Sequence, residues 1–144
     1  MRVYVDTSVY NRPFDDQRQP RIWLEALALG VILQTIAAGE AESINSTVLR
    51  YENDRNPFPL RKQWVNRCLG LFVHFQAVDE DIRQRAQELE RNGIAPVDAL
   101  HVASAETALA DYFLTCDDRL LRRYRGNVKV LNPVDFVLAT AGGN

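Results

Sequence analysis

Short apolar segments alternate with helical patterns along the whole chain, and this alternation constrains the fold more than any other feature of the sequence. Segments rich in β-branched and aromatic residues predict strands at 2–6, 41–45, 72–78, 112–115 and 128–131. Strands joined by helices form right-handed crossovers, which place the strands parallel to one another. We therefore expect a three-layer α/β/α sandwich with a mostly parallel central sheet.

The helical segments carry boundary signals of their own. They are expected at 21–38, 46–55, 60–69, 79–91, 96–110, 118–124 and from 133 onward. Ser46 and Asp79 are capping residues at the start of two of them, and Gly39 lies just past the end of the first. The face of the first helix predicted to be buried consists of Ile22, Trp23, Leu27, Ile32 and Ile36.

Length and charge restrict the class of protein. With 144 residues, of which 47% are hydrophobic and 25% charged, the chain fits one globular domain at 1–140 followed by a short flexible tail at 141–144. The formal net charge is −2, whereas a non-specific polyanion-binding protein is typically basic. A nucleic acid would therefore have to contact a local basic patch.

Cysteine usage and hydropathy predict a cytoplasmic protein. Cys68 and Cys116 are too few for a disulfide framework and do not form a C-x-x-C pair. The longest apolar run, Ala26 to Leu33, has eight residues, whereas a membrane-spanning helix needs about 20. The first residues lead directly into a strand-like segment and show no signal-peptide pattern.

Acidic residues fall where the predicted strands end. Asp6 closes the first strand, Asp117 and Asp118 follow the fourth, Asp98 lies in the first turn of its helix, and Glu52 lies in the helix after the second strand. In a parallel sheet, ligands bind at the carboxyl ends of the strands. Carboxylates that meet there repel one another unless a cation such as Mg²⁺ or Mn²⁺ joins them, and such an ion activates water.

Each of these acids, taken alone, also fits an ordinary structural role. A single aspartate at a strand end is typical of a turn or a helix cap. Asp98 suits the positive end of a helix dipole, and Glu52 suits a solvated helix face. The metal prediction depends on the set, because the expected fold directs all of the acids to one edge.

Four segments resemble the PIN-domain ribonucleases, the family of the VapC-type toxins, and together they extend over essentially the whole chain. In order, they are Val5-Asp6-Thr7-Ser8, 46–52, 94–105 and Thr115-Cys116-Asp117. The resemblance implies that the catalytic, metal-binding acids are Asp6, Glu52, Asp98 and Asp117. None of the four is missing, although the segment 11–16 departs from the shortest toxins.

The adjacent acids Asp117 and Asp118 leave a choice for the last ligand. Neighbouring side chains diverge, so both cannot easily face one ion. The Thr115-x-Asp117 spacing resembles the family motif. We therefore expect Asp117 to be the ligand and Asp118 to cap or flank the following helix.

Three further residues are candidates for supporting roles. The hydroxyls of Ser8 and Thr115 suit either the orientation of a carboxylate or metal-bound water, or the capping of nearby backbone. His101 lies three residues after Asp98, on the same helical face. It is predicted to be a packed or outer-shell histidine rather than a ligand, because Mg²⁺ prefers oxygen.

Two basic stretches lie beside the acids and are candidates for RNA contact. The stretch that flanks Glu52 consists of Arg50, Arg55, Arg61, Lys62 and Arg67, and the one after Asp117 consists of Arg119, Arg122, Arg123 and Arg125. The main candidates among them are Arg50, Arg55, Arg119, Arg122 and Arg123. Arginines at helical spacing are also typical of a solvated helix face.

The favoured function is a metal-dependent endoribonuclease that acts on single-stranded or looped RNA. The resemblance adds an antitoxin protein as a partner and a homodimer as the assembly, and the broad apolar face of the helix at 21–38 also favours self-association. The alternative is a catalytically silent PIN-like module that binds RNA or protein. An aspartate phosphotransfer domain ranks below both, because Asp6-Thr7-Ser8 lacks the second aspartate of an Asp-x-Asp phosphatase and a receiver has its acidic pair after the first strand.

Overall fold

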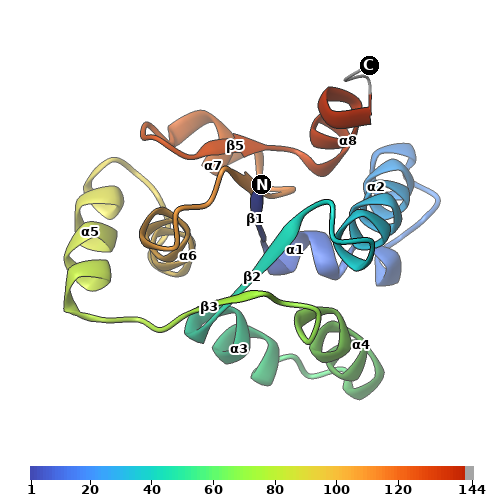
Figure 1. The fold of residues 1–144 in the computed structure, drawn as a ribbon, viewed down its shortest axis with the longest axis horizontal. Helices are drawn as coiled ribbons and strands as arrows, with labels where there is room; N and C mark the ends of the chain where they lie inside the picture. The colour runs from blue at the N-terminus through green and yellow to red at the C-terminus, as the bar shows by residue number, and fades with distance from the viewer. Residues whose placement is uncertain (142–144) are drawn as a thin grey trace.

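A computed structural model describes residues 1–141 and contains a five-stranded sheet in which all neighbouring strands are parallel (Figure 1). The strands are β1 (Arg2–Val5), β2 (Glu42–Ser46), β3 (His74–Gln76), β4 (Tyr112–Leu114) and β5 (Lys129–Leu131). Their spatial order is β3-β2-β1-β4-β5, so β1 is the central strand. Tyr4 of β1 pairs with Ile44 of β2 and Phe113 of β4.

Helices cover both faces of this sheet. They are α1 (Thr7–Tyr10), α2 (Pro20–Ala37), α3 (Thr47–Asp54), α4 (Pro59–Leu69), α5 (Glu80–Arg91), α6 (Pro96–Thr107), α7 (Asp118–Arg123) and α8 (Pro133–Ala141), with a 3₁₀ turn η1 (Arg12–Phe14). Figure 1 shows α5 and α6 packed together on one face, with α2 and α8 together on the other. The predicted α/β/α sandwich is therefore confirmed, and its sheet is wholly parallel.

Most predicted elements occur within a few residues of their expected ends. Two of the expected caps are present: Ser46 Oγ accepts a hydrogen bond from Leu49 N at 3.1 Å, and Asp79 Oδ1 accepts one from Ile82 N at 2.8 Å. Gly39 follows α2 with φ +77°, a conformation that favours glycine. The short helix α1 was not predicted, and η1 occupies part of the segment expected to be loop.

The predicted buried face of α2 is partly wrong. Ile32 and Ile36 are buried, but Trp23 and Leu27 are each about half exposed. The inward face contains Glu25, which is fully buried. Because apolar residues surround much of this helix, periodicity alone does not identify the face that packs against α8 and η1.

The length and composition of α2 would also allow it to cross a membrane, a criterion that core helices of soluble proteins meet as well. The tail expected at 141–144 lies outside the described residues from 142 onward, and Ala141 is the last residue of α8.

Candidate metal centre at the carboxyl edge of the sheet

Asp6 stands at the carboxyl end of the central strand, where the apolar core meets the edge of the sheet. Its side chain is almost completely buried, with a residue exposure of 4%. Its backbone N–H donates to the carbonyl of Leu114 in β4 at 2.9 Å, and α1 begins at the next residue. The strand therefore carries this carboxylate into a site where little water can stabilise its charge.

Two hydroxyl groups hold the Asp6 carboxylate in place. Ser8 Oγ and Thr115 Oγ1 donate to its Oδ2 atom at 3.0 and 2.9 Å. Each hydroxyl is itself fixed by the loop after β4, since Ser8 Oγ accepts from Cys116 N and Thr115 Oγ1 accepts from Asp117 N, both at 3.1 Å. These neutral donors orient the carboxylate but do not neutralise it.

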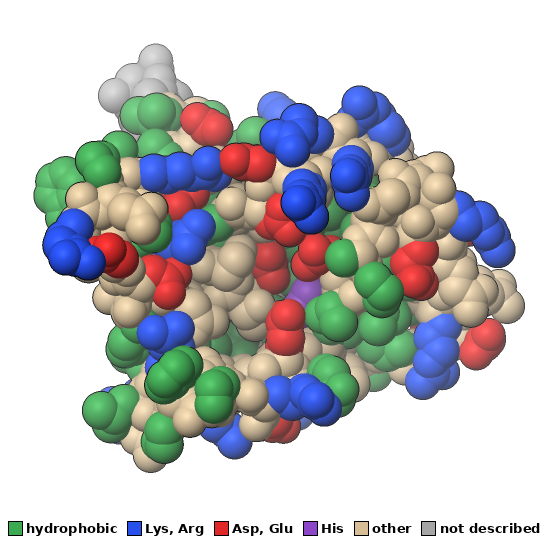
Figure 2. All heavy atoms as spheres, turned by 180° about the vertical axis from the view of Figure 1, so that it is seen from behind, with side chains coloured by type: hydrophobic (Ala, Val, Ile, Leu, Met, Phe, Trp, Pro, Cys, Tyr) green, Lys and Arg blue, Asp and Glu red, His purple; other side chains and the backbone are tan. Residues whose placement is uncertain are grey.

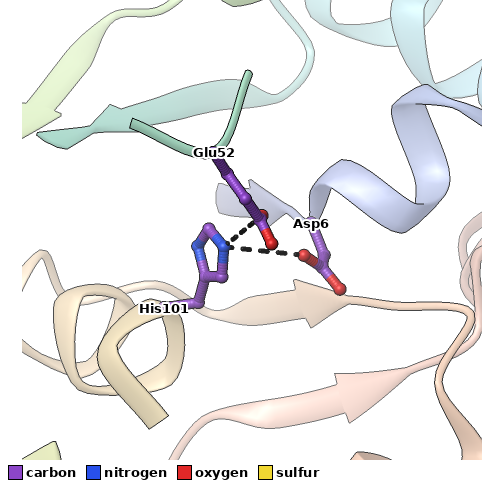
Figure 3. A group of neighbouring side chains, drawn as sticks. All are labelled: Asp6, Glu52 and His101. Carbon is purple, nitrogen blue, oxygen red and sulfur yellow. Dashed lines mark hydrogen bonds and ion pairs between the residues drawn. The ribbon is translucent and has the colours of Figure 1, made fainter. Parts of the chain in front are cut away.

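A chain of hydrogen bonds connects Glu52 to the sheet interior. Glu52 Oε1 accepts from Thr7 Oγ1 at 2.5 Å and is hydrogen-bonded to His101 Nε2 at 2.7 Å (Figure 3). His101 Nδ1 is 2.6 Å from the Tyr4 hydroxyl, which is 2.7 Å from Ser46 Oγ. Both ring nitrogens of His101 therefore have protein partners, as expected of a histidine that orients another residue.

The protonation of His101 is coupled to the acids around it. Burial lowers the pKa of its imidazole, but the hydrogen bond to Glu52 and the charges of Asp6 and Glu52 outweigh this and raise the pKa overall. For Glu52 burial acts in the other direction and raises the pKa of the carboxyl group, but the contacts with His101 and Thr7 outweigh it and lower the pKa overall. Possible ligand atoms of Asp6, Glu52 and His101 all lie within 4.8 Å of one another.

Asp98 lies in a less favourable electrostatic setting. Burial, followed by the charges of Asp6 and Asp117, raises the pKa of its carboxyl group to about 7. Asp98 and Asp117 line one pocket of about 410 Å³, together with Arg119 and Arg123. Asp98 is therefore influenced by the charges of Asp6, Asp117 and Glu52, but among the described residues the neighbouring ligand atoms within 4.8 Å belong to Asp6, Glu52 and His101, and not to Asp98 or Asp117.

As expected, the side chains of Asp117 and Asp118 have different partners, but Asp117 rather than Asp118 caps the helix. Asp117 is the N-cap of α7, and its Oδ1 accepts from Arg119 N at 2.9 Å. Asp118 flanks this cap as the first residue of α7 and forms a two-pronged ion pair with Arg21 of α2, at 2.7 Å for each prong. Capping therefore falls to Asp117, the residue that also lines the pocket with Asp98.

The predicted RNA-contact arginines divide into two groups. Arg119 and Arg123 line the pocket that contains Asp98 and Asp117. Within residues 1–141, Arg50, Arg55 and Arg122 line neither this pocket nor the one that borders Glu52. Figure 2 shows acidic side chains around a hollow in one face of the molecule, with Lys and Arg side chains near it.

Three contributors to this network were not singled out from the sequence as site residues. They are Tyr4, Thr7 and Ser46. A signal existed for Tyr4, because it lies two residues before Asp6 and alternation along a strand places both on one face. The contact of Thr7 with Glu52 had no local signal, since 45 residues separate them in the sequence.

The donor set fits a hard divalent cation. Among the described residues, the ion pairs of Asp6 and Glu52 involve His101 alone and no Lys or Arg. Four carboxylates with hydroxyl supports offer the oxygen ligands that Mg²⁺ and Mn²⁺ prefer. Burial and, after it, the charges of Asp6 and Asp117 raise the pKa of Asp98, and a cation would relieve the charge contribution.

The chain is similar to a known protein family and to chains of known structure. The family model of the PIN domain matches residues 3–127. A chain in the crystal structure of FitAcB from Neisseria gonorrhoeae has a similar fold, with a TM-score of 0.56 and 20% identity over 91% of this chain and 97% of that one. A chain in the crystal structure of VapBC2 from Rickettsia felis, bound to a DNA fragment from its promoter, gives a TM-score of 0.58 and 14% identity over 92% and 98%. No curated protein sequence matches significantly.

Proposed function

The chain belongs to the PIN domain family, whose members are generally metal-dependent nucleases, and we propose that it is a metal-dependent endoribonuclease. The observation that carries this proposal is the set of four acids at the carboxyl edge of the sheet. Asp6 is buried there with no Lys or Arg partner among the described residues, and burial together with the charges of Asp6 and Asp117 raises the pKa of Asp98 to about 7. An ordinary structural cluster would pair such acids with Lys or Arg.

The oxygen atoms of Asp6, Glu52, Asp98 and Asp117 would hold the ion. When bound, Mg²⁺ or Mn²⁺ supplies an activated water and neutralises charge on a phosphodiester. The protein provides the orientation of these ligands in advance. Ser8 and Thr115 hold Asp6, while Thr7 and His101 hold Glu52.

The substrate is proposed to enter along the pocket that Asp98 shares with Arg119 and Arg123. A phosphate backbone needs cationic contacts near the acids, because the acids alone would repel it. Arg119 and Arg123 supply those contacts where the pocket borders Asp98 and Asp117. Such contacts recognise the charge of the phosphates rather than the base sequence, so RNA binding should weaken as salt concentration rises.

Assembly and partners are part of the same proposal. Exposed apolar side chains on α2, namely Trp23, Leu24, Leu27 and Val31, form a stripe that suits a homodimer contact. An antitoxin partner is proposed from the resemblance to VapC-type toxins and from the fold shared with a chain of the VapBC2 structure. A cytoplasmic location agrees with the free state of Cys68 and Cys116.

A cleavage assay on total RNA tests the function directly. The purified protein should cut RNA in the presence of Mn²⁺, and excess EDTA should stop the reaction. Equal cleavage in EDTA would contradict the metal mechanism. A protein that binds RNA but neither cleaves it nor gains thermal stability with Mn²⁺ would instead be the silent binding module.

A further inference from the structure

We propose that a second pocket, beside Glu52, binds one unpaired nucleobase of the RNA substrate, an inference that rests on the proposed function. This base pocket has a volume of about 260 Å³ and is lined by Thr7, Asn11, Glu52, Asn56, Phe58 and Arg61, among others. It shares Glu52 with the acid cluster. The pocket that contains Arg119 borders the cluster through other residues, Asp98 and Asp117. A strand whose phosphate lies at the acids would therefore have room for a neighbouring base beside Glu52.

A group of aromatic side chains in contact with Arg61 supports one wall of the base pocket. The Trp64 and Phe14 rings meet edge to face with centroids 5.5 Å apart, and the Arg61 guanidinium lies 5.3 Å from the Phe14 centroid and 4.8 Å from that of Phe58. Phe58 is the outermost member and is 57% exposed. A base placed on Phe58 would add to a group of aromatic side chains and Arg61 that the protein has already ordered, which reduces the entropy cost of binding.

The floor of the base pocket contains a buried acceptor that lacks a partner. Asn53 lines the pocket and is only 2% exposed. Its amide nitrogen donates to Lys62 O and to Asn66 Oδ1, at 3.0 and 2.8 Å, but its Oδ1 atom has no hydrogen-bond partner in the described chain. A buried unpaired acceptor is costly, and a base N–H would satisfy it once a neighbouring side chain of the pocket moves aside, because the oxygen is itself shielded from solvent.

Two more amides at the pocket have hydrogen-bonding capacity to spare. Asn56 Nδ2 donates to Asn11 Oδ1 over a long 3.3 Å, and Asn56 Oδ1 accepts from Phe58 N at 3.1 Å. Each amide group has two N–H donors and two acceptor lone pairs. Asn56 therefore keeps a donor and Asn11 an acceptor beside an aromatic surface, which is the chemistry that recognises an unpaired base in RNA.

Substitution of Phe58 in a binding assay tests the base pocket. The full chain in the Asp98→Asn background is titrated with a fluorescently labelled single-stranded RNA octamer, and Kd is measured by anisotropy. Phe58→Ala should raise Kd about tenfold, the scale of one lost base stack. Phe58→Trp should restore tight binding, whereas Phe58→Leu should not, because only the aromatic face is required.

The matched control is Leu60→Ala, which removes an apolar side chain of 78% exposure two residues away from Phe58. It should leave Kd unchanged. Octamers that carry one abasic nucleotide, moved along the strand, identify the bound base. At the correct position, the Asp98→Asn parent should bind the abasic octamer as weakly as Phe58→Ala binds the intact octamer, and Phe58→Ala should cause no further loss.

The outcomes separate the base pocket from the nuclease activity. If the protein cleaves RNA and Phe58→Ala binds the octamer as tightly as the parent, the base pocket is wrong and the nuclease remains. If no RNA is cleaved but the abasic and Phe58 effects coincide, the base pocket stands and the catalytic proposal fails. Loss of a protein partner in Phe58→Ala, with RNA binding intact, would assign the pocket to that partner and overturn the proposal.

Discussion

Two buried carboxylates in this molecule have different kinds of hydrogen-bond partner. Glu25 of α2 is fully buried and contacts two arginines, with Arg12 Nε 2.9 Å from its Oε1 and Arg21 Nε 3.2 Å from its Oε2. Asn132 Nδ2 also donates to Oε2, at 2.5 Å. Asp6, nearly as buried, receives hydrogen bonds from the neutral hydroxyls of Ser8 and Thr115.

The difference lies in whether the protein supplies an arginine partner for the buried acid. The Glu25 centre joins η1, α2 and the segment before α8, and its negative charge is balanced within the protein. The Asp6 carboxylate is oriented by hydroxyl groups of the protein, but no Lys or Arg of the described residues balances its charge. Burial alone therefore does not distinguish the two centres, whereas the presence or absence of an arginine partner does.

The largest expected effect is the loss of cleavage when the acid cluster is changed. Asp6→Asn and Asp98→Asn should each reduce RNA cleavage to background, because the ion loses a charged ligand, while circular dichroism shows a native fold. Mn²⁺ affinity, measured by calorimetry, should fall in parallel. Asp81→Asn, at an exposed position in α5, is the control and should retain activity. If Asp6→Asn kept full activity, Asp6 would not be required for cleavage, and the proposed distinction between the Asp6 and Glu25 centres would be wrong.

The second effect concerns folding rather than activity. Glu25→Ala should lower the free energy of unfolding by about 3 kcal/mol, because it leaves Arg12 and Arg21 without their buried partner. Urea denaturation measures the loss, with Glu40→Ala at an exposed site as the control. Mn²⁺ affinity of the folded variant should match that of the parent protein. A large drop in metal affinity would mean that the Glu25 centre also serves the acid cluster.

The third effect is a gain in stability that depends on pH. The folded pKa of Asp98 is raised to about 7, so ionisation of this group favours the unfolded chain and stability falls as pH rises from about 4 to about 7. Without metal, Asp98→Asn should therefore be more stable than the parent at pH 8, by about 1–2 kcal/mol after allowance for partial exposure, and the gain should shrink toward pH 4.

Thermal melts at several pH values, with EDTA, measure this gain. Asp118→Asn should instead lower stability, because Arg21 lowers the pKa of Asp118 and the substitution removes a favourable ion pair. Added Mn²⁺ should reverse the order and stabilise the parent more than Asp98→Asn. A gain that did not change with pH would show that repulsion at Asp98 is not its source.

The smallest effect distinguishes Asp117 from Asp118. Asp118→Ala breaks a largely exposed ion pair with Arg21, so stability should fall slightly and cleavage should persist. Asp117→Ala serves as the comparison and should lose most cleavage and bind Mn²⁺ more weakly. Calorimetry on both variants decides the assignment. Equal losses of affinity would mean that both residues contribute to the site, and a larger loss in Asp118→Ala would reverse the assignment.

Much of the candidate site was predictable because it follows from chain direction. Alternating strands and helices predict a parallel sheet, and parallel strands bring their carboxyl ends to one edge. Asp6 and Asp117 follow two adjacent strands, β1 and β4, so their proximity needs no knowledge of side-chain packing. Glu52 and Asp98 were added from their positions in the predicted helices, and the resemblance to PIN-domain ribonucleases then assigned all four acids as metal ligands.

The sequence by itself thus determined the sheet, the order of its helices and the edge at which the acids meet, because hydrophobic periodicity and connection handedness are local properties of the chain. Only the tertiary structure decided which partner each acid takes. Thr7 reaches Glu52 across 45 residues and Tyr4 reaches His101 across 97, and Glu25 rather than Trp23 faces inward from α2. Such contacts exist only after distant segments pack together, and a helix with apolar residues on several sides contains no local signal for the side that will be covered.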